Sequence, residues 1–322
     1  MAIDLKQAVM RLMDGASFEA HGSELEGTTP DEIRSEIRSL CQFVPPGTNV
    51  YVPHGPGEGF EAVTGLAKIF KEEGFYPIPH ICARRLNEDE ITVGLTELQD
   101  HGIDTVMLLG GDVNDSEAGQ YKSSSDILHS GLLERTGVKK VLFGGHPDGN
   151  RLNPGNDGND WDVLITKLED AERKGFETGV VTQVSYSPSD VIGWEKQFRE
   201  REQLSDILNT RDIKVPVEIG VLGPADLKKK FELAKICGIN TPMDVARKVN
   251  LKTAVGLAMF KKPDAMITDL ANHISVTSTT LRFSTVAQIQ DTLCNYVKPI
   301  QEGEFSISKN WLGQPQYDID PA

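Results

Sequence analysis

Cysteine is scarce in this sequence, and its placement argues against a metal site. The four cysteines, Cys41, Cys82, Cys237 and Cys294, lie far apart and form no CxxC pair. This usage is ordinary for a reducing compartment and does not provide a zinc site. We therefore expect a cytoplasmic protein.

Long apolar runs and clustered positive charge are also missing. No segment reaches about 18 consecutive apolar residues, the length of a membrane span. Residues 1–15 lack the apolar core of a signal peptide. Lys and Arg total 33 against 48 Asp and Glu, which gives a net charge of −15. Nucleic acids and anionic membranes attract clustered Lys and Arg, so neither is an expected partner.

The familiar catalytic signatures are absent as well. The sequence contains no HExxH and no GxSxG, and the GPGEG loop at 55–59 matches neither a Walker A nor a GxGxxG in register. Three histidines, His54, His80 and His146, could in principle gather, but one carboxylate and one glutamine beside them would make a poor zinc shell. We expect no metal.

What the sequence does contain is a regular alternation of short apolar runs and longer stretches of helical period. With 322 residues, of which 39% are hydrophobic, the chain has room for one large domain or two small ones. Eight alternating units favour an α/β fold, a closed (β/α)8 TIM barrel, over an open doubly wound sheet. The expected strands are 16–21, 48–53, 76–82, 105–111, 139–145, 178–186, 215–223 and 280–285.

Glycines mark the expected helix ends. Five of them fall where a helix should stop before the next strand: Gly74, Gly102, Gly137, Gly175 and Gly238. The interval 240–275 is expected to add extra helices before the last strand. No linker or low-complexity tract interrupts the chain, so we expect a single catalytic domain over 1–322. The expected helices are 59–74, 86–102, 124–137, 160–175, 189–208, 225–238 and 286–297.

Polar side chains occupy most of the expected strand ends, where TIM barrels place their chemistry. Each one has an ordinary structural explanation: an aspartate after two glycines caps a helix, and a lone histidine is a satisfied buried imidazole. Their convergence favours a site, because barrel closure brings them to one rim and a core gains nothing from them there. These residues are Glu19, His54, His80, Asp112, His146, Thr182 and Gln183.

Two glycine pairs stand at these ends, Gly110-Gly111 and Gly144-Gly145. The second lies in VLFGGHPDGN (141–150), where an apolar run breaks into glycine and presents His146. Glycine lets a ligand approach the backbone closely, as a flat ring or a phosphate requires. We expect the pair to leave room for such a ligand.

Five motifs in order resemble those of methylenetetrahydrofolate reductases: SFEAH, IPHIC, LLGGDVND, FGGHPDGN and VVTQVSYSP. The tract VPVEIGVLGPADLKKKFELAKICGI resembles the seventh βα unit of that family, so the likeness covers nearly the whole chain in scattered pieces. It implies a barrel with FAD across the strand ends. It also implies reduction of 5,10-methylenetetrahydrofolate to 5-methyltetrahydrofolate by NADH or NADPH.

The resemblance also implies a role for each matching residue. Glu19 matches the general acid, and Asp112 matches the aspartate beside the flavin and the pterin. Gln183 matches the glutamine that contacts the substrate. His80 and His146 match histidines that contact the flavin.

Other positions are implied with less exact matches. His54 and Gly55 fall where the second strand end touches the cofactor, although their residue types differ from those of the family. Gly111 and Gly145 belong to the cofactor site through the glycine pairs. After the TQ motif only Tyr186 remains of an aromatic run, and we expect it to contact the substrate.

The departures from the family fall on flavin and substrate-tail contacts. Gly110 replaces a basic residue, and Leu142 replaces an aromatic residue. Gln288 lies near the position of the basic residue that, in the family, helps hold the substrate tail. Alternatives therefore stay open: a flavin-independent reductase that takes hydride directly from NAD(P)H, a tetrahydrofolate-dependent demethylase or methyltransferase, or a non-catalytic folate-binding protein. The sequence leaves open the choice between NADH and NADPH, the pterin variety, the direction of the reaction and the oligomeric state, with a homo-oligomer among the options.

The reductase chemistry explains the residue types. N10 of the substrate must be protonated before the imidazolidine ring opens to an N5 iminium cation, which then accepts hydride. We expect Glu19 to donate this proton from an apolar surrounding to which Phe18 contributes, and Asp112 to stabilise the cation. Gln183 is expected to bond the pterin edge.

Overall fold

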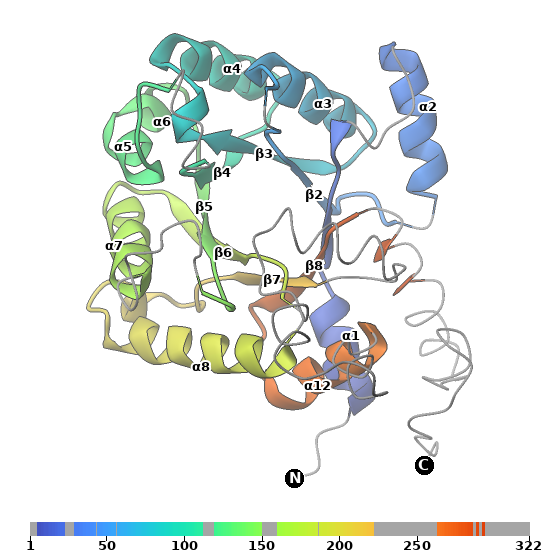
Figure 1. Cartoon of the computed structure of the whole chain (residues 1–322), viewed down its shortest axis with the longest axis vertical. Coiled ribbons are helices and arrows are strands. Elements are labelled where there is room, and N and C mark those ends of the chain that lie inside the picture. Colours follow the sequence, from blue (N-terminus) through green and yellow to red (C-terminus); the bar gives the residue numbers. More distant parts are fainter. Residues whose placement is uncertain are drawn as a thin grey trace, which may run out of the picture.

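The computed structural model describes residues 5–22, 29–42, 44–55, 57–111, 119–149, 160–185, 187–221, 263–285, 288–289 and 292–293. In these ranges eight strands form a closed barrel in sequence order, and every neighbouring pair is parallel. Helices form a ring around the strands (Figure 1). The predicted TIM barrel is confirmed.

All eight strands overlap the runs expected from the sequence. Short apolar runs between turn residues become strands because their side chains are buried on both faces, inside the barrel and beneath the helices. The strands are β1 (Ser17–Glu19), β2 (Asn49–Val52), β3 (Tyr76–Cys82), β4 (Thr105–Leu109), β5 (Lys140–Gly145), β6 (Glu177–Thr182), β7 (Val217–Val221) and β8 (Thr279–Phe283).

Most of the described helices lie where the 3.6-residue period predicted them. Two were not predicted, α1 (Leu5–Met13) and α2 (Pro30–Leu40). The second has a sequence signature, a capping box between Thr29 and Glu32 with Pro30 at its first turn. The others are α3 (Phe60–Glu72), α4 (Glu88–Asp100), α5 (Ser124–His129), α6 (Leu132–Arg135), α7 (Asp160–Arg173), α8 (Pro188–Leu204) and α12 (Pro263–His273).

The helix expected over 124–137 is divided into α5 and α6. Gly131 takes a left-handed conformation with φ of 78°, which a continuing right-handed helix does not allow. Four of the five glycines expected to end helices adopt positive φ, from 66° at Gly102 to 89° at Gly74, the others being Gly137 and Gly175. Gly238 lies outside the described residues. In the interval 240–275 the described part contains α12. Residues 225–238 and most of 286–297 lie outside the described residues.

Side chains on the outer face of the barrel pack against the helices. Phe18 of β1 meets Phe70 and Phe75 edge-on, with ring centroids 6.3 and 6.2 Å away. Beside β5, the rings of Trp161 and Trp194 stack at 5.2 Å. This outer layer forms most of the hydrophobic core.

The interior of the barrel is divided by polarity. One side holds an apolar cluster of buried side chains, whereas the other side, from β7 through β8 and β1 to β2, holds polar ones. The apolar cluster consists of Tyr51, Ile78, Met107, Leu142 and Val181, with Leu109 packed against it. The polar side contains Ser17, Glu19, Asn49, Glu218 and Arg282.

A second polar cluster attaches α8 to the barrel from outside. Arg199 is buried and forms ion pairs with Glu195 and Glu202, at 2.9 and 3.0 Å. It also donates to the carbonyl oxygen of Val215 and to the hydroxyl of Thr279, next to the starts of β7 and β8.

None of the described helices combines the length and apolar character needed to cross a membrane. The extent of the catalytic domain over 1–322 stays a prediction.

Candidate active site at the barrel mouth

Glu19 is the last residue of β1 and lies at the C-terminal opening of the barrel, which we call the mouth. Its side chain is 18% exposed, and its carboxylate forms an ion pair with the guanidinium of Arg282 from β8. The ring of His21 lies 3.9 Å from the other carboxylate oxygen. A partly exposed carboxylate at this end of a TIM-barrel strand is in the position where such barrels carry out chemistry.

The surroundings of Glu19 differ from those expected. Side chains alternate along a strand, so Phe18 points away from Glu19 and packs under α3 against Phe70. The expectation that Phe18 forms an apolar wall beside Glu19 is therefore wrong. The group next to the carboxylate is the positive charge of Arg282.

Arg282 is almost fully buried, and it reaches across the barrel beneath the mouth. Its Nη2 donates to the carbonyl oxygen of Thr182 at 2.9 Å, at the end of β6. Its guanidinium carbon lies 5.7 Å from the centroid of the Tyr51 ring. A single side chain thus contacts residues of β6, β1 and β2.

A second carboxylate lies inside the barrel. Glu218 of β7 accepts hydrogen bonds from the hydroxyl of Ser17 and from the side-chain amide of Asn49, the latter at 3.5 Å. Burial raises the pKa of Tyr51 well above its usual value, and the charge of nearby Glu218 adds to this effect. Tyr51 therefore stays a neutral phenol at ordinary pH.

His80 of β3 is buried on the border between the apolar and polar sides. Its ring meets that of Tyr51 edge-on at 5.9 Å, and its Nε2 has no hydrogen-bond partner in the described part of the chain. Burial lowers the pKa of His80 to about 3, and the positive charge of Arg282 contributes to the shift. The imidazole is therefore neutral at the pH of ordinary metabolism.

The two glycines of β5 face opposite ways. A Cβ on Gly144 would point into the barrel and find its nearest atoms at 3.7 Å, on His146 and Leu109. A Cβ on Gly145 would lie 2.6 Å from the Trp194 ring, outside the barrel. The missing side chain of Gly145 thus makes room for a tryptophan and not for a ligand, which corrects the expectation for this half of the pair.

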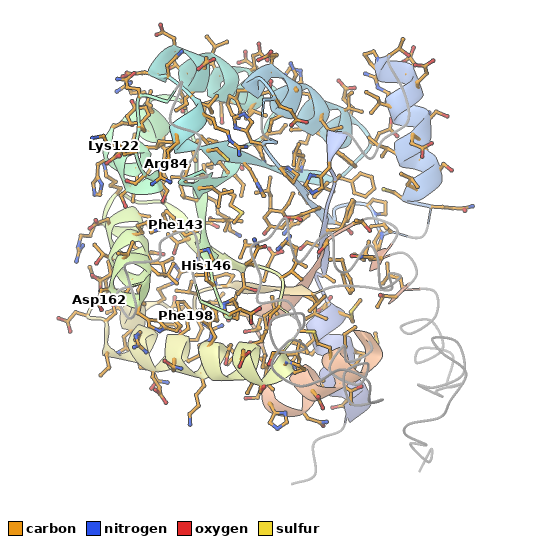
Figure 2. All side chains as sticks on the ribbon, viewed as in Figure 1. Arg84, Lys122, Phe143, His146, Asp162 and Phe198 are labelled. Atoms are coloured by element: carbon orange, nitrogen blue, oxygen red, sulfur yellow. The ribbon has the colours of Figure 1, made fainter. Side chains whose placement is uncertain are left out.

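His146 follows the glycine pair and is partly buried. Figure 2 places it inside the ring of helices, near the ends of β5 and β6. Asp148, in the same turn, accepts a hydrogen bond from the hydroxyl of Ser185 at 2.7 Å. Gln183 is partly buried, and its side-chain oxygen accepts from the backbone N–H of Val184 at 3.1 Å.

The other predicted contacts take part in loop structure. The Nε2 of His54 lies 2.9 Å from the carbonyl oxygen of Glu58, and the N–H of Gly55 donates to the carboxylate of Glu58. Gly111 has a positive φ of 83°, and its carbonyl oxygen accepts from Arg84. Asp112 and Tyr186 lie outside the described residues. The roles of all these positions remain predictions.

Three interior residues were missed in the sequence: Tyr51, Glu218 and Arg282. They lie within strands, whereas the residues expected to form the site lie at strand ends. A signal was present, since Glu218 and Arg282 are charged residues surrounded by apolar neighbours in VPVEIGVLG and TLRFST. Charged residues inside strands are costly to bury unless they are paired, so each of them indicates a partner.

Comparison with known proteins supports the fold. No family model matches the sequence. The structure is similar to that of an uncharacterized protein from Clostridium thermocellum that binds two copies of 5-methyl-5,6,7,8-tetrahydrofolic acid, with a TM-score of 0.60. The two sequences are 12% identical over 92% of this chain and 99% of that chain. At this identity, the likeness shows the fold alone.

Two structures from Toxoplasma gondii ME49, provisionally assigned as deoxyribose-phosphate aldolase, are more distant. Their TM-scores are 0.42 and 0.38, at 10% and 13% identity. The matches cover 91% and 93% of this chain, and 98% and 94% of those chains. Scores this low carry no argument about function.

The opposite orientations of the two glycines predict opposite effects of alanine. Gly145→Ala should lower the free energy of unfolding by about 1–3 kcal/mol, because overpacking displaces Trp194. Gly144→Ala should change it little, because its nearest neighbours are at ordinary contact distance. Urea unfolding of both variants measures the difference, and equal losses would contradict the orientations.

The neutral state of His80 predicts a pH-dependent stability. The folded pKa of about 3 lies below the value of 6.5 for an unperturbed histidine, so the unfolded chain binds an extra proton between them, and stability falls as the pH drops below 6.5. Between pH 7.5 and 5 this loss amounts to about 2 kcal/mol. His80→Phe should remove that part of the pH dependence.

The measurement is urea unfolding at both pH values. His101→Gln, which removes an exposed histidine, is the matched control and should behave as the wild type does. An unchanged pH dependence in His80→Phe would show that the pKa of His80 is the same in the folded and the unfolded chain, which would contradict the lowered value.

Proposed function

We propose that this chain binds a reduced folate at the barrel mouth and reduces 5,10-methylenetetrahydrofolate to 5-methyltetrahydrofolate with NADH or NADPH. The observation that carries the proposal is Glu19, the residue matching the general acid, at the mouth of a TIM barrel and paired with Arg282. The order of the five motifs and the similar barrel that binds 5-methyltetrahydrofolate support the same substrate class.

In this proposal Glu19 donates the proton to N10 that opens the substrate ring. Its carboxylate contacts the guanidinium of Arg282, which lies deeper in the barrel. Asp112 stabilises the N5 iminium cation, and Gln183 and Tyr186 hold the substrate. His80 is neutral and would contact the flavin ring without exchanging a proton.

FAD is the cofactor that the family resemblance implies, and two features at the mouth fit a flat ring. The Nε2 of His80 is buried without a hydrogen-bond partner among the described residues, and Gly144 leaves the inner face of β5 without a side chain. His80 and His146 would hold the ring, together with the backbone at Gly111 and the loop at His54 and Gly55. When bound, FAD would carry hydride from the nicotinamide to the folate.

One feature favours a folate enzyme without flavin as the second candidate. Leu142, at the position where the family has an aromatic residue, is packed in the apolar cluster of the interior. This candidate takes hydride directly from NAD(P)H, or transfers a methyl group to or from tetrahydrofolate. It uses the same pterin site.

An absorbance spectrum of the purified protein decides between the two candidates. We expect flavin bands between about 350 and 500 nm, and their loss on addition of NADH or NADPH under nitrogen. A colourless protein that still binds 5-methyltetrahydrofolate would support the second candidate. A colourless protein that binds no folate would contradict the proposed function.

Glu19→Gln tests the proton donor. Glutamine keeps the size and the hydrogen bonding of the side chain but cannot donate the proton, so folate reduction should slow by about two to four orders of magnitude. Oxidation of NADH or NADPH and binding of 5-methyltetrahydrofolate should stay within a few-fold of wild type. Stopped-flow spectroscopy of each half-reaction and calorimetry measure these quantities.

Glu218→Gln is the matched control, because it removes the other interior carboxylate, which bonds Ser17 and Asn49. Its folate reduction should fall less than tenfold. Glu19→Gln with near wild-type folate turnover would exclude Glu19 as the donor.

A further inference from the structure

Arg282 is held in a way that fixes the position of its charged end. The N–H of Gly220 in β7 donates to the hydroxyl of Thr182, and the carbonyl oxygen of Thr182 accepts from Nη2 of Arg282, both at 2.9 Å. Thr182 thus connects β7 and the guanidinium to the end of β6. A guanidinium donates from a rigid planar fork, so fixing one nitrogen also directs the other.

Gly220 leaves the space that this arrangement needs. A Cβ at that position would lie 2.9 Å from Nη2 of Arg282 and 2.7 Å from the carbonyl oxygen of Thr182. The sequence EIGV places the glycine directly where the arginine crosses from β8 toward β6. Only a residue without a side chain permits this crossing.

The second terminal nitrogen of the Arg282 guanidinium contacts Glu19. Nη1 of Arg282 forms the ion pair, and the side chain of Arg282 is 3% exposed against 18% for Glu19. Arg282 pairs with Ser17 along the strands, two residues before Glu19. The guanidinium therefore lies beneath the carboxylate, on the side away from the opening.

We propose that Arg282 is the positioning residue for Glu19, holding its carboxyl group at the mouth through the Thr182 carbonyl and the gap at Gly220. The inference rests on the proposed function for its catalytic consequence. The placement itself is a property of the barrel and can be measured without turnover.

Arg199 provides a matched comparison, because it is a second buried arginine with two carboxylate partners. Its carboxylate partners Glu195 and Glu202 belong to its own helix, and it also donates to Thr279 and to the Val215 carbonyl. None of these residues lies at the mouth. Arg199 therefore shows what a buried arginine contributes when its role is structural.

The first test is nuclear magnetic resonance of the arginine Nε–H groups in the full-length protein labelled with ¹⁵N. Glu19→Gln should shift the Arg282 signal and leave the Arg199 signal in place. Arg282→Lys and Arg199→Lys assign the two signals. An Arg282 signal that does not respond to Glu19→Gln overturns the proposal, whether or not the protein reduces folate.

The second test is the rate of the folate half-reaction in Arg282→Lys. Lysine keeps the positive charge but loses the fork that reaches Thr182 and Glu19 together. We expect kcat to fall by about 100-fold, the effect of a small misplacement of a reacting group. The Kd for 5-methyltetrahydrofolate should stay within a few-fold of wild type, and Arg199→Lys should change kcat less than a few-fold.

The outcomes separate the two proposals. If Arg282→Lys and Arg199→Lys lower kcat equally, or if Arg282→Lys loses folate binding to the same extent as turnover, Arg282 is not a positioning residue. If the wild-type protein neither binds 5-methyltetrahydrofolate nor turns over, the proposed function fails. The resonance shift then decides alone whether Arg282 positions Glu19.

Discussion

The guanidinium of Arg282 connects three strands beneath the mouth of the barrel, and the polar side of the interior depends on it. Without this charge, the partly buried carboxylate of Glu19 would have no cationic partner among the interior contacts, and Tyr51 would lose the cation beside its ring. A buried charge is tolerated only when it is paired and hydrogen-bonded. Arg282 meets this condition through Glu19 on one nitrogen and Thr182 on another.

The division of the interior follows from this pairing. The barrel closes by pairing β8 with β1, so Arg282 and Ser17 become neighbours. Glu218 lies close enough to accept a hydrogen bond from the hydroxyl of Ser17. Opposite them, Leu142 and Met107 fill the interior with apolar volume. A flat ligand at the mouth would thus contact polar side chains of the interior on one side and apolar side chains on the other, as a pterin or a flavin requires.

His80 stands on the border between these two sides. Its imidazole is held neutral by burial and by the charge of Arg282. In the proposed function, His80 would hold the flavin ring from this border. Whether flavin takes part is a separate question from folate binding, because the second candidate would use the same pterin site without flavin.

The sequence by itself determined the barrel, because alternating apolar runs and helical periods depend on local chain chemistry that each segment carries alone. It also placed Glu19, His80 and Gly144 at or near strand ends. It could not show that α5 and α6 are separate helices, since the left-handed conformation of Gly131 is one of several that glycine adopts. Local spacing indicates that an element exists and leaves its orientation open.

Only the tertiary structure decided which way each strand residue faces and which distant residues meet. Phe18 and Gly145 face the helices, although the sequence suggested that Phe18 lies beside Glu19 and that Gly145 faces a ligand. The ion pair between Glu19 and Arg282 joins the first strand to the last, and it exists because the barrel closes. A period of two residues distinguishes two faces of a strand but not which one is inside, and only closure supplies that information.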